Sequence, residues 1–224
     1  MDSDMVAFGD LHLAWRAADI ILDEARKSGI DIAFNLGDED TFCGGPQSYY
    51  DRLYGAMREF RDEKPGRRLI CLIGDKTGGV PSDLKRNYVG TDSRGRIKGS
   101  LVFREGNVIA AHNGRWIIDE LGDFIRDYPG GEPLVVFHGH SHSMGVLPEY
   151  RWLKDDEKVD FLPEGGREVR LEPGRVYWAN PGAPCLYATD DSDAANFLVY
   201  SPSRRIITLR SILYPRPRLA DLTD

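Results

Sequence analysis

The sequence predicts an α/β protein in which a second β-sheet packs on the first. Through residue 140, apolar runs of strand length alternate with segments of helical periodicity. This alternation is typical of a parallel sheet built from βαβ units. The C-terminal part contains further strand-like runs and little helical periodicity, so we expect a second sheet there.

Composition places the chain among globular proteins. Its 224 residues suffice to bury a substantial core, and we expect a single domain over residues 1–224. The net charge of −7 disfavours a dedicated nucleic-acid binder. No apolar run approaches the ~18 residues of a membrane helix, and the acidic N-terminus does not resemble a signal peptide. The three cysteines form no C-x-x-C pair, so we expect a reduced, cytoplasmic protein without membrane association.

The first half of the chain contains strands separated by helices. The expected strands are residues 5–9, 31–36 and 68–73. Residues 15–28 place apolar side chains on one helical face and stop at Gly29. A second helix is expected to begin at Pro46 and to end before Pro65, because proline is tolerated at the start of a helix and ends one elsewhere.

The second half is expected to be richer in strands. Its elements are a hairpin (101–104 and 108–111), a helix (116–128), strands at 135–138 and 176–179, and a closing hairpin (197–201 and 205–212). Two polar segments, at about 77–99 and 148–174, are interpreted as loop excursions, the second with a short hairpin or loop of its own, and a C-terminal tail is expected from about residue 213.

Five strand-like runs end in an acidic residue or a histidine. In chain order these residues are Asp10 with His12, Asp38, Asp75, His112, and then His140 with His142 in Gly139-His140-Ser141-His142. Sites in open α/β sheets form at the carboxyl ends of strands, so we expect these side chains to meet. A single aspartate after glycine is ordinary turn chemistry. The ordered set holds four of the five histidines, and it favours a metal centre over coincidence or a decayed site.

Mixed aspartate and histidine ligation suits Mn, Fe, Zn, Ni or Co ions, whereas Ca prefers oxygen ligands throughout. Two divalent ions ~3.5–4 Å apart need a carboxylate that bridges them, with further ligands on either side. Such a pair lowers the pKa of a shared water molecule and holds a phosphoryl oxygen. We therefore expect two divalent metal ions as cofactors, with Mn²⁺ as the first choice.

These residues resemble the pattern of the calcineurin-like binuclear metallophosphoesterases, in particular their small single-domain phosphodiesterases. That family carries D-x-H, G-D, G-N-H or G-N-C, H, and G-H-x-H at successive strand ends. The resemblance spans residues 5–142 and extends to Asn180-Pro181-Gly182 and the closing hairpin. It implies a four-layer αββα sandwich with two mixed β-sheets.

The resemblance also implies two ligand sets that share Asp38. One metal ion takes Asp10, His12, Asp38 and His142, and the other takes Asp38, Asp75, His112 and His140. Asp75 and Lys76 depart from the family, which has Asn followed by His or Cys at these positions. We interpret this departure as a charge-compensated exchange, in which Lys76 acts as a catalytic residue on the phosphate or the leaving oxygen, or else points into solvent. Arg115 is a candidate substrate-binding residue or a surface residue, and His138 is either a supporting or a core residue.

The resemblance implies metal-dependent hydrolysis of phosphate esters, in particular of a small phosphodiester, by a hydroxide that bridges two metals. A phosphomonoesterase and a nucleotide pyrophosphatase are alternatives, whereas a short acidic chain disfavours a DNA repair nuclease. A non-catalytic metal-binding or interaction descendant of the fold stays open because of Asp75-Lys76. The sequence leaves open the substrate, the native metal and whether the protein forms a homo-oligomer.

Overall fold

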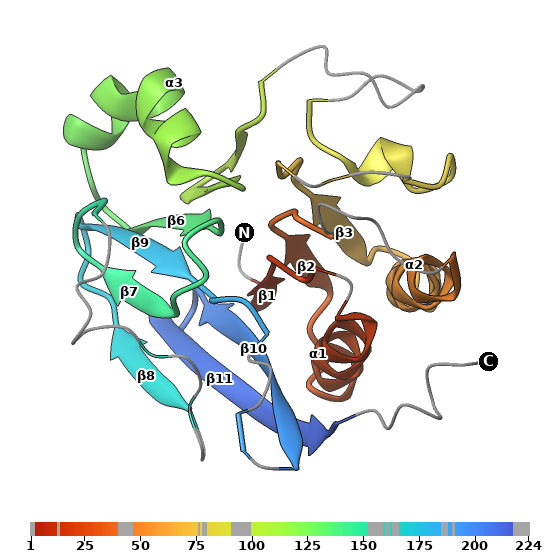
Figure 1. Cartoon of the computed structure of the whole chain (residues 1–224). Helices are drawn as coiled ribbons and strands as arrows, with labels where there is room; N and C mark the ends of the chain where they lie inside the picture. The colour runs from red at the N-terminus through yellow and green to blue at the C-terminus, as the bar shows by residue number, and fades with distance from the viewer. Residues whose placement is uncertain are drawn as a thin grey trace.

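The computed structural model describes residues 3–12, 14–39, 47–75, 77, 80–90, 100–151, 159, 162, 166–184, 188–189 and 191–216. Two β-sheets lie face to face, and helices cover their outer faces (Figure 1). This arrangement is the four-layer αββα sandwich that the sequence resemblance implied. Within the described residues, no helix is long and apolar enough to cross a membrane.

The first sheet has six strands. They are β1 (Met5–Phe8), β2 (Ile32–Asn35), β3 (Arg68–Cys71), β8 (Arg167–Arg170), β10 (Ser192–Ser201) and β11 (Ile206–Pro215), in the order β3-β2-β1-β10-β11-β8. Strands β1, β2 and β3 run parallel, and β10 pairs with β1 in the antiparallel sense. The crossover helices α1 (Trp15–Lys27) and α2 (Gln47–Asp62) pack on its outer face.

The second sheet has five strands. They are β4 (Phe103–Glu105), β5 (Val108–Ala111), β6 (Leu134–His138), β7 (Gly145–Leu147) and β9 (Val176–Asn180), in the order β4-β5-β6-β9-β7. Strands β5, β6 and β9 are parallel. Helix α3 (Gly114–Arg126) covers the outer face, opposite to α1 and α2.

The strand period of two divides each strand between two apolar cores. In β1, Met5 and Ala7 face the core between the sheets, whereas Val6 and Phe8 face the helices. All four side chains are fully buried. A strand that is buried on both faces reads as a continuous apolar run, and this explains why these strands were recognisable in the sequence.

The structure departs from the expected elements in three places. Strand β11 continues to Pro215, which pairs with Ser192 of β10, so the segment predicted as a tail from residue 213 begins as strand. The short strand β7 was not predicted, and β8, inside the excursion 148–174 where a separate short hairpin or loop was expected, pairs instead with β11 of the first sheet. Of the excursion 77–99, residues 78–79 and 91–99 lie outside the described residues, but Leu84 and Tyr88 are buried in the core beneath α1 and α2.

Candidate metal centre

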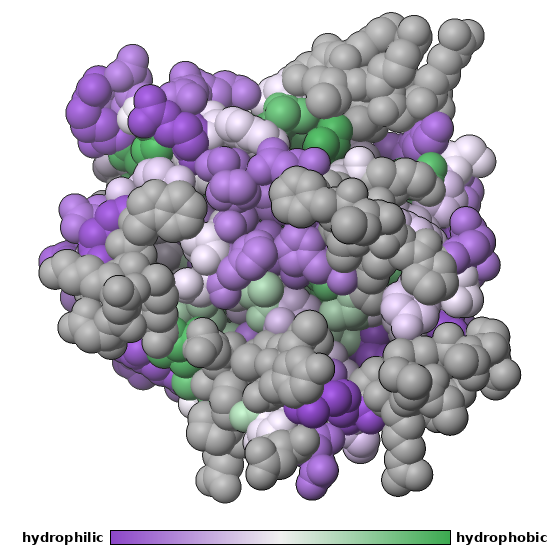
Figure 2. All heavy atoms as spheres, viewed as in Figure 1, coloured by the Kyte–Doolittle hydropathy of each residue, from purple (hydrophilic) through white to green (hydrophobic). Residues whose placement is uncertain are grey.

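The predicted residues follow strands of both sheets. Asp10 and His12 follow β1, Asp38 follows β2, Asp75 follows β3, His112 follows β5, and His140 and His142 follow β6. The loops of the two sheets are in contact, because the backbone N–H of His140 lies 3.0 and 2.9 Å from the two carboxylate oxygens of Asp10 and donates to them. In the view of Figure 2, hydrophilic residues gather in the middle of the molecule, between α3 on one side and α1 and α2 on the other.

The side chains form two groups that could each hold a metal ion. Asp10, His12 and His142 form one group, and Asp38, His112 and His140 form the other, with the potential ligand atoms of each group within 4.8 Å of one another. The Nε2 atoms of His12 and His142 are 3.2 Å apart. Two imidazole nitrogens that converge on one small volume are well placed to coordinate a cation.

The tautomer of His112 is set by its surroundings. Its Nδ1–H donates to the carbonyl oxygen of Leu36 at 2.8 Å. Its Nε2 therefore carries a lone pair, and this atom lies 3.3 Å from Nδ1 of His140 and 3.5 Å from Oδ2 of Asp38. A backbone partner that fixes one nitrogen and leaves the other for the metal is typical of metal-binding histidines.

Asp75 lies at the open side of the second group. Its Oδ2 is 3.3 Å from Nδ1 of His140, and its side chain is 42% exposed. By contrast, the side chains of Asp10 and Asp38 are buried. Asp75 can therefore approach a cation in this group while still contacting solvent.

The centre concentrates negative charge in a buried place. The pKa of Asp10 is raised to about 7: burial is the main cause, the charges of Asp38, Asp75 and Glu39 add to it, and the hydrogen bond from the His140 N–H opposes it. Burial also lowers the pKa of His112 and that of His142, which favours neutral imidazoles. Buried carboxylates beside neutral imidazoles are a donor set that suits divalent cations.

The backbone takes an uncommon conformation at most of these positions. Five site residues have φ between 43° and 68°: Asp10, His12, Asp38, His140 and His142. Within the described chain, Arg205 is the one other non-glycine residue with positive φ. Left-handed conformations are disfavoured for residues with a side chain and persist only where the surroundings hold them. Here the N–H groups of Asp10 and His12 donate to the carbonyls of Gly37 and Asp38, both at 2.9 Å.

Glycine precedes several of these residues because the loops touch. A Cβ on Gly74 would lie 2.2 Å from Oδ1 of Asp38, and a Cβ on Gly139 would lie 2.8 Å from Oδ2 of Asp10. A Cβ on Gly37 would lie 2.6 Å from the backbone nitrogen of Gly74. The Gly-Asp and Gly-His pattern of the sequence thus lets neighbouring loops approach closely.

Glu39, which directly follows Asp38, stabilises two loops of the candidate centre by hydrogen bonds, and it was not predicted. Its buried carboxylate accepts hydrogen bonds from Asn35 Nδ2 at 2.6 Å, from the Thr77 hydroxyl at 2.8 Å and from the Tyr88 hydroxyl at 2.8 Å. Thr77 Oγ1 in turn accepts from the N–H of Gly74 at 2.9 Å. The carboxylate therefore ties the loop of Asp38 to the loop of Asp75, which helps to hold both acids in place.

Asn180 supports the loop of the two C-terminal histidines. Its Nδ2 donates to the carbonyl of Gly139 at 3.2 Å and to Ser141 Oγ at 2.7 Å. Its Oδ1 accepts from the N–H of Gly182 at 2.8 Å, which closes the Asn180-Pro181-Gly182 turn. This turn belongs to the sequence resemblance. Its hydrogen bonds hold the segment between His140 and His142 in place.

The remaining predicted residues lie apart from the two groups. Arg115 is at the start of α3, 70% exposed, with its Nε 2.9 Å from Oδ1 of Asp119. His138 is buried against the rings of Tyr150 and Trp178, and its Nδ1–H donates to the carbonyl of Gly139 at 3.3 Å. His138 is therefore a core residue. Lys76 lies outside the described residues.

Comparison with known proteins agrees with this architecture. No protein-family model and no curated protein sequence matches the chain. Among solved structures, it is similar to a metallophosphoesterase from Sphaerobacter thermophilus, with 16% identity over 99% of this chain and 91% of that one and a TM-score of 0.51. The chain has the metallophosphoesterase fold. A novel archaeal phosphodiesterase is also similar, with 13% identity over 94% of this chain and 99% of that one and a TM-score of 0.52.

Both sheets of this chain contain parallel strands that are followed by the predicted residues. In this chain, β1, β2 and β3 supply four of the predicted residues, and β5 and β6 supply the other three. The two groups each combine residues from both sheets. The site therefore depends on how the two sheets are packed together.

Proposed function

We propose that the protein is a binuclear metallophosphoesterase that hydrolyses a small phosphodiester. The observation that carries this proposal is the pair of Asp/His groups at the meeting point of both sheets. The likeness in fold to a metallophosphoesterase and to a phosphodiesterase supports it. Two bound divalent cations would supply Lewis acidity and an activated water molecule for attack on phosphorus.

The proposed ligand sets are those that the resemblance implied. Asp10, His12 and His142 would hold one cation, Asp75, His112 and His140 would hold the other, and Asp38 would be shared by both. The contact of Asp38 with His112 and the convergence of the ring nitrogens support this assignment. Mn²⁺ is the first cation to test, because mixed carboxylate and imidazole ligation suits it.

The role of the protein groups follows from their positions. His112 keeps its Nε2 lone pair available because Leu36 holds its Nδ1–H. Asp10 is oriented by the backbone N–H of His140, so its two oxygens cannot rotate freely. Asp75 stands at the exposed side, where substrate would enter. Lys76, next in sequence, is proposed to bind the phosphate or to stabilise the leaving oxygen.

The proposal is tested with chelator-treated protein and two chromogenic esters, bis(p-nitrophenyl) phosphate and p-nitrophenyl phosphate, with and without Mn²⁺. We expect Mn²⁺-dependent turnover that favours the diester. Asp38→Asn, which keeps the shape and removes the charge, should lower the rate by ~100-fold, as losses at metal ligands and their supports do. Asp123→Asn is the matched control, because the Asp123 side chain on α3 is 89% exposed, and its rate should not change.

A preference for the monoester would replace the phosphodiesterase proposal by a phosphomonoesterase. A second candidate is a metal-binding descendant without turnover, which the extra carboxylate of Asp75 favours because it reduces the net positive charge offered to an anionic substrate. Two metal ions bound per chain with no turnover of either ester, or of a nucleotide pyrophosphate, would select this candidate. Absence of metal binding would contradict both.

A further inference from the structure

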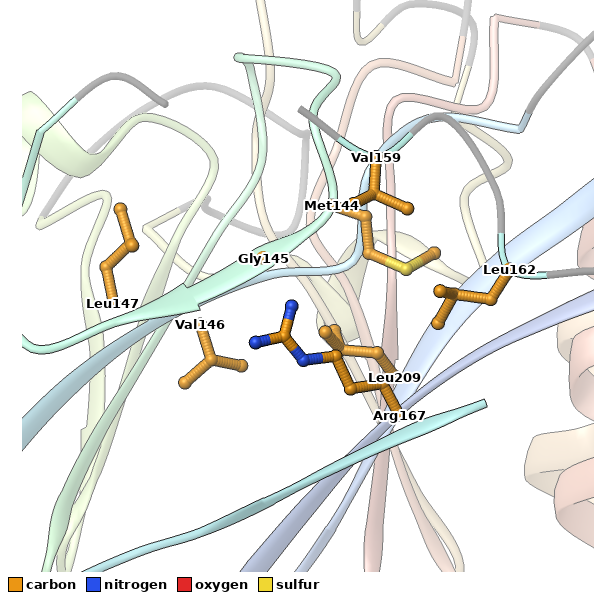
Figure 3. A pocket seen from close by; sticks show the side chains of 8 residues that line it. All are labelled: Met144, Gly145, Val146, Leu147, Val159, Leu162, Arg167 and Leu209. Atoms are coloured by element: carbon orange, nitrogen blue, oxygen red, sulfur yellow. The ribbon is translucent and has the colours of Figure 1, made fainter. Parts of the chain in front are cut away.

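A cavity of about 140 Å³ lies between the edges of the two sheets, apart from the seven residues of the metal centre. The edge strand β7 forms one wall, and Arg167 of the edge strand β8 and Leu209 of β11 contribute to the other. Apolar side chains line it: Met144, Val146, Leu147, Val159, Leu162 and Leu209. In Figure 3, Val146, Met144 and Leu209 lie around Arg167, whereas Leu147 points to the other side of β7.

Arg167 supplies the one charged side chain of this lining. Side chains alternate along β8, so Arg167 shares a face with Val169, which packs against the core between the sheets. Arg167 is exposed to solvent, so it stands at the rim of the cavity, with its guanidinium group beside Met144, Val146 and Leu209 in Figure 3. On the opposite face, Glu168 forms an ion pair with Arg204 at 3.5 Å. In the part of the chain that the structure describes, no carboxylate forms such a pair with Arg167.

The size and the charge of the cavity define its ligand. A cavity of ~150 Å³ lined by apolar residues binds benzene in an engineered protein, so this one fits a group of about the same size. One guanidinium matches a planar monoanion, to which it can donate two parallel hydrogen bonds. We propose that this cavity binds a small organic carboxylate with a ring-sized apolar body, the carboxylate on Arg167 and the body between β7 and β8.

A different role for Arg167 requires no ligand. A charged residue that points inward at a sheet edge hinders pairing with the edge of another molecule. Both β7 and β8 are edge strands, so this role fits the same position. The two roles of Arg167 predict different binding results. Only a binding site has a higher affinity for an anion than for the neutral analogue of that anion.

Met144 provides a reporter inside the cavity. The chain has four methionines, of which Met5 and Met57 are buried elsewhere in the core. Protein labelled with ¹³C at the methionine methyl groups is titrated with phenylacetate, and Met144→Leu assigns the signal. Phenylacetamide is the neutral analogue, acetate is the head group alone, and benzylphosphonate presents a dianion.

We expect phenylacetate to shift the Met144 signal in a saturable way and to leave Met5 and Met57 unchanged. Phenylacetamide should bind about tenfold more weakly, the effect of losing one charge-assisted hydrogen bond, and acetate should cause no shift. Arg167→Gln should lower phenylacetate binding to the phenylacetamide level. Arg170→Gln, on the opposite face of β8, should leave it unchanged. Val146→Phe should abolish binding by filling the cavity.

Three results would overturn the proposal. The first is the absence of a saturable Met144 shift in protein whose Met5 and Met57 signals confirm the fold. The second is equal binding of phenylacetate and phenylacetamide, or no effect of Arg167→Gln, which would leave only the edge-protecting role. The third is tighter binding of benzylphosphonate, which would assign a dianionic ligand. None of these results depends on turnover at the metal centre.

Discussion

Asp10 illustrates the conflict between burial and charge in this protein. Its carboxylate is fully buried, and its pKa is raised to about 7. A buried ionised carboxylate is destabilising unless it is paired, and the His140 N–H compensates only in part. Such an arrangement persists where function requires it, so the site residues themselves are expected to oppose the stability of the fold.

Glu39 gives the first prediction at the residue scale. Glu39→Gln replaces one acceptor oxygen by an NH₂ group that faces a donor, either the Thr77 hydroxyl or the donor pair Asn35 and Tyr88. We expect the free energy of unfolding in urea to fall by about 2 kcal/mol, the usual effect of a buried hydrogen bond left unmade. The affinity for Mn²⁺ should also fall, because the loops of Asp38 and Asp75 lose their link.

Glu149→Gln is the matched control, since the side chain of Glu149 is 72% exposed. Unchanged Mn²⁺ affinity in Glu39→Gln would mean that this carboxylate only stabilises the fold. The sequence offered no signal for Glu39, because an acid beside Gly37-Asp38 resembles any loop residue. Its function depends on Thr77 and Tyr88, which are distant in sequence and near in space.

Asp75 and Lys76 give a second prediction at this scale. If the exchange is charge-compensated, Asp75→Asn alone and Lys76→His alone should each lower kcat/KM more than the double variant does. The proximity of Asp75 to His140, at 3.3 Å, places the altered charge beside the second group. A double-mutant cycle on diester hydrolysis measures the coupling. Strictly additive effects would exclude compensation.

His138 provides a pH prediction. Burial lowers its pKa from 6.5 to about 4, so the unfolded chain takes up the proton first as the pH falls. Stability is therefore complete above the unfolded pKa of 6.5 and declines between 6.5 and 4. We expect this histidine to reduce the free energy of unfolding by about 2 kcal/mol between pH 7 and pH 5.

The variant His138→Asn tests this effect, because an amide can keep the hydrogen bond to Gly139. Packing loss lowers its stability at every pH, but its decline between pH 7 and pH 5 should be about 2 kcal/mol smaller than that of the wild type. Urea unfolding at both pH values, in the same chelator, measures the difference. Equal declines would mean that His138 is protonated as readily in the folded protein as in the unfolded chain.

At the scale of elements, strand ends carry the site and helices provide the support. The sequence predicted the helices and the buried strands because their apolar periodicity is local. It did not predict β7, whose three residues are only half-buried, or the buried positions of Leu84 and Tyr88. These features depend on pairing with β9 and on contacts beneath α2, which no local pattern records.

Two glycines should respond in opposite ways to the same substitution. Gly55 lies within α2, and a Cβ there meets no atom within 4 Å. Gly55→Ala should raise the free energy of unfolding by about 0.5–1 kcal/mol, because glycine is a poor helix former. Gly74→Ala should lower it and also weaken Mn²⁺ binding, because its Cβ would collide with Asp38. Thermal unfolding with and without Mn²⁺ measures both effects, and a neutral Gly74→Ala would contradict the close approach of these loops.

At the scale of the whole molecule, the candidate centre joins the two sheets. Asp10 and His12 come from the first sheet and share a group with His142 from the second. Asp38 likewise shares a group with two histidines of the second sheet. The order of the candidate residues along the chain could be read from the sequence, but the packing of one sheet on the other could not be predicted, because it depends on side chains distributed over the whole core.

Metal binding should therefore act as a link between the sheets. At a free Mn²⁺ concentration of 100 times its Kd, each site should add about 2.7 kcal/mol to the free energy of unfolding. Amide hydrogen exchange should slow in β2 and in β6 together, because the groups draw ligands from the loops after both strands. Asp38→Asn should lose most of this stabilisation, whereas Asp123→Asn should keep it. Slower exchange confined to one sheet would mean that the cation binds the loops of that sheet alone, and it would contradict a centre shared by both.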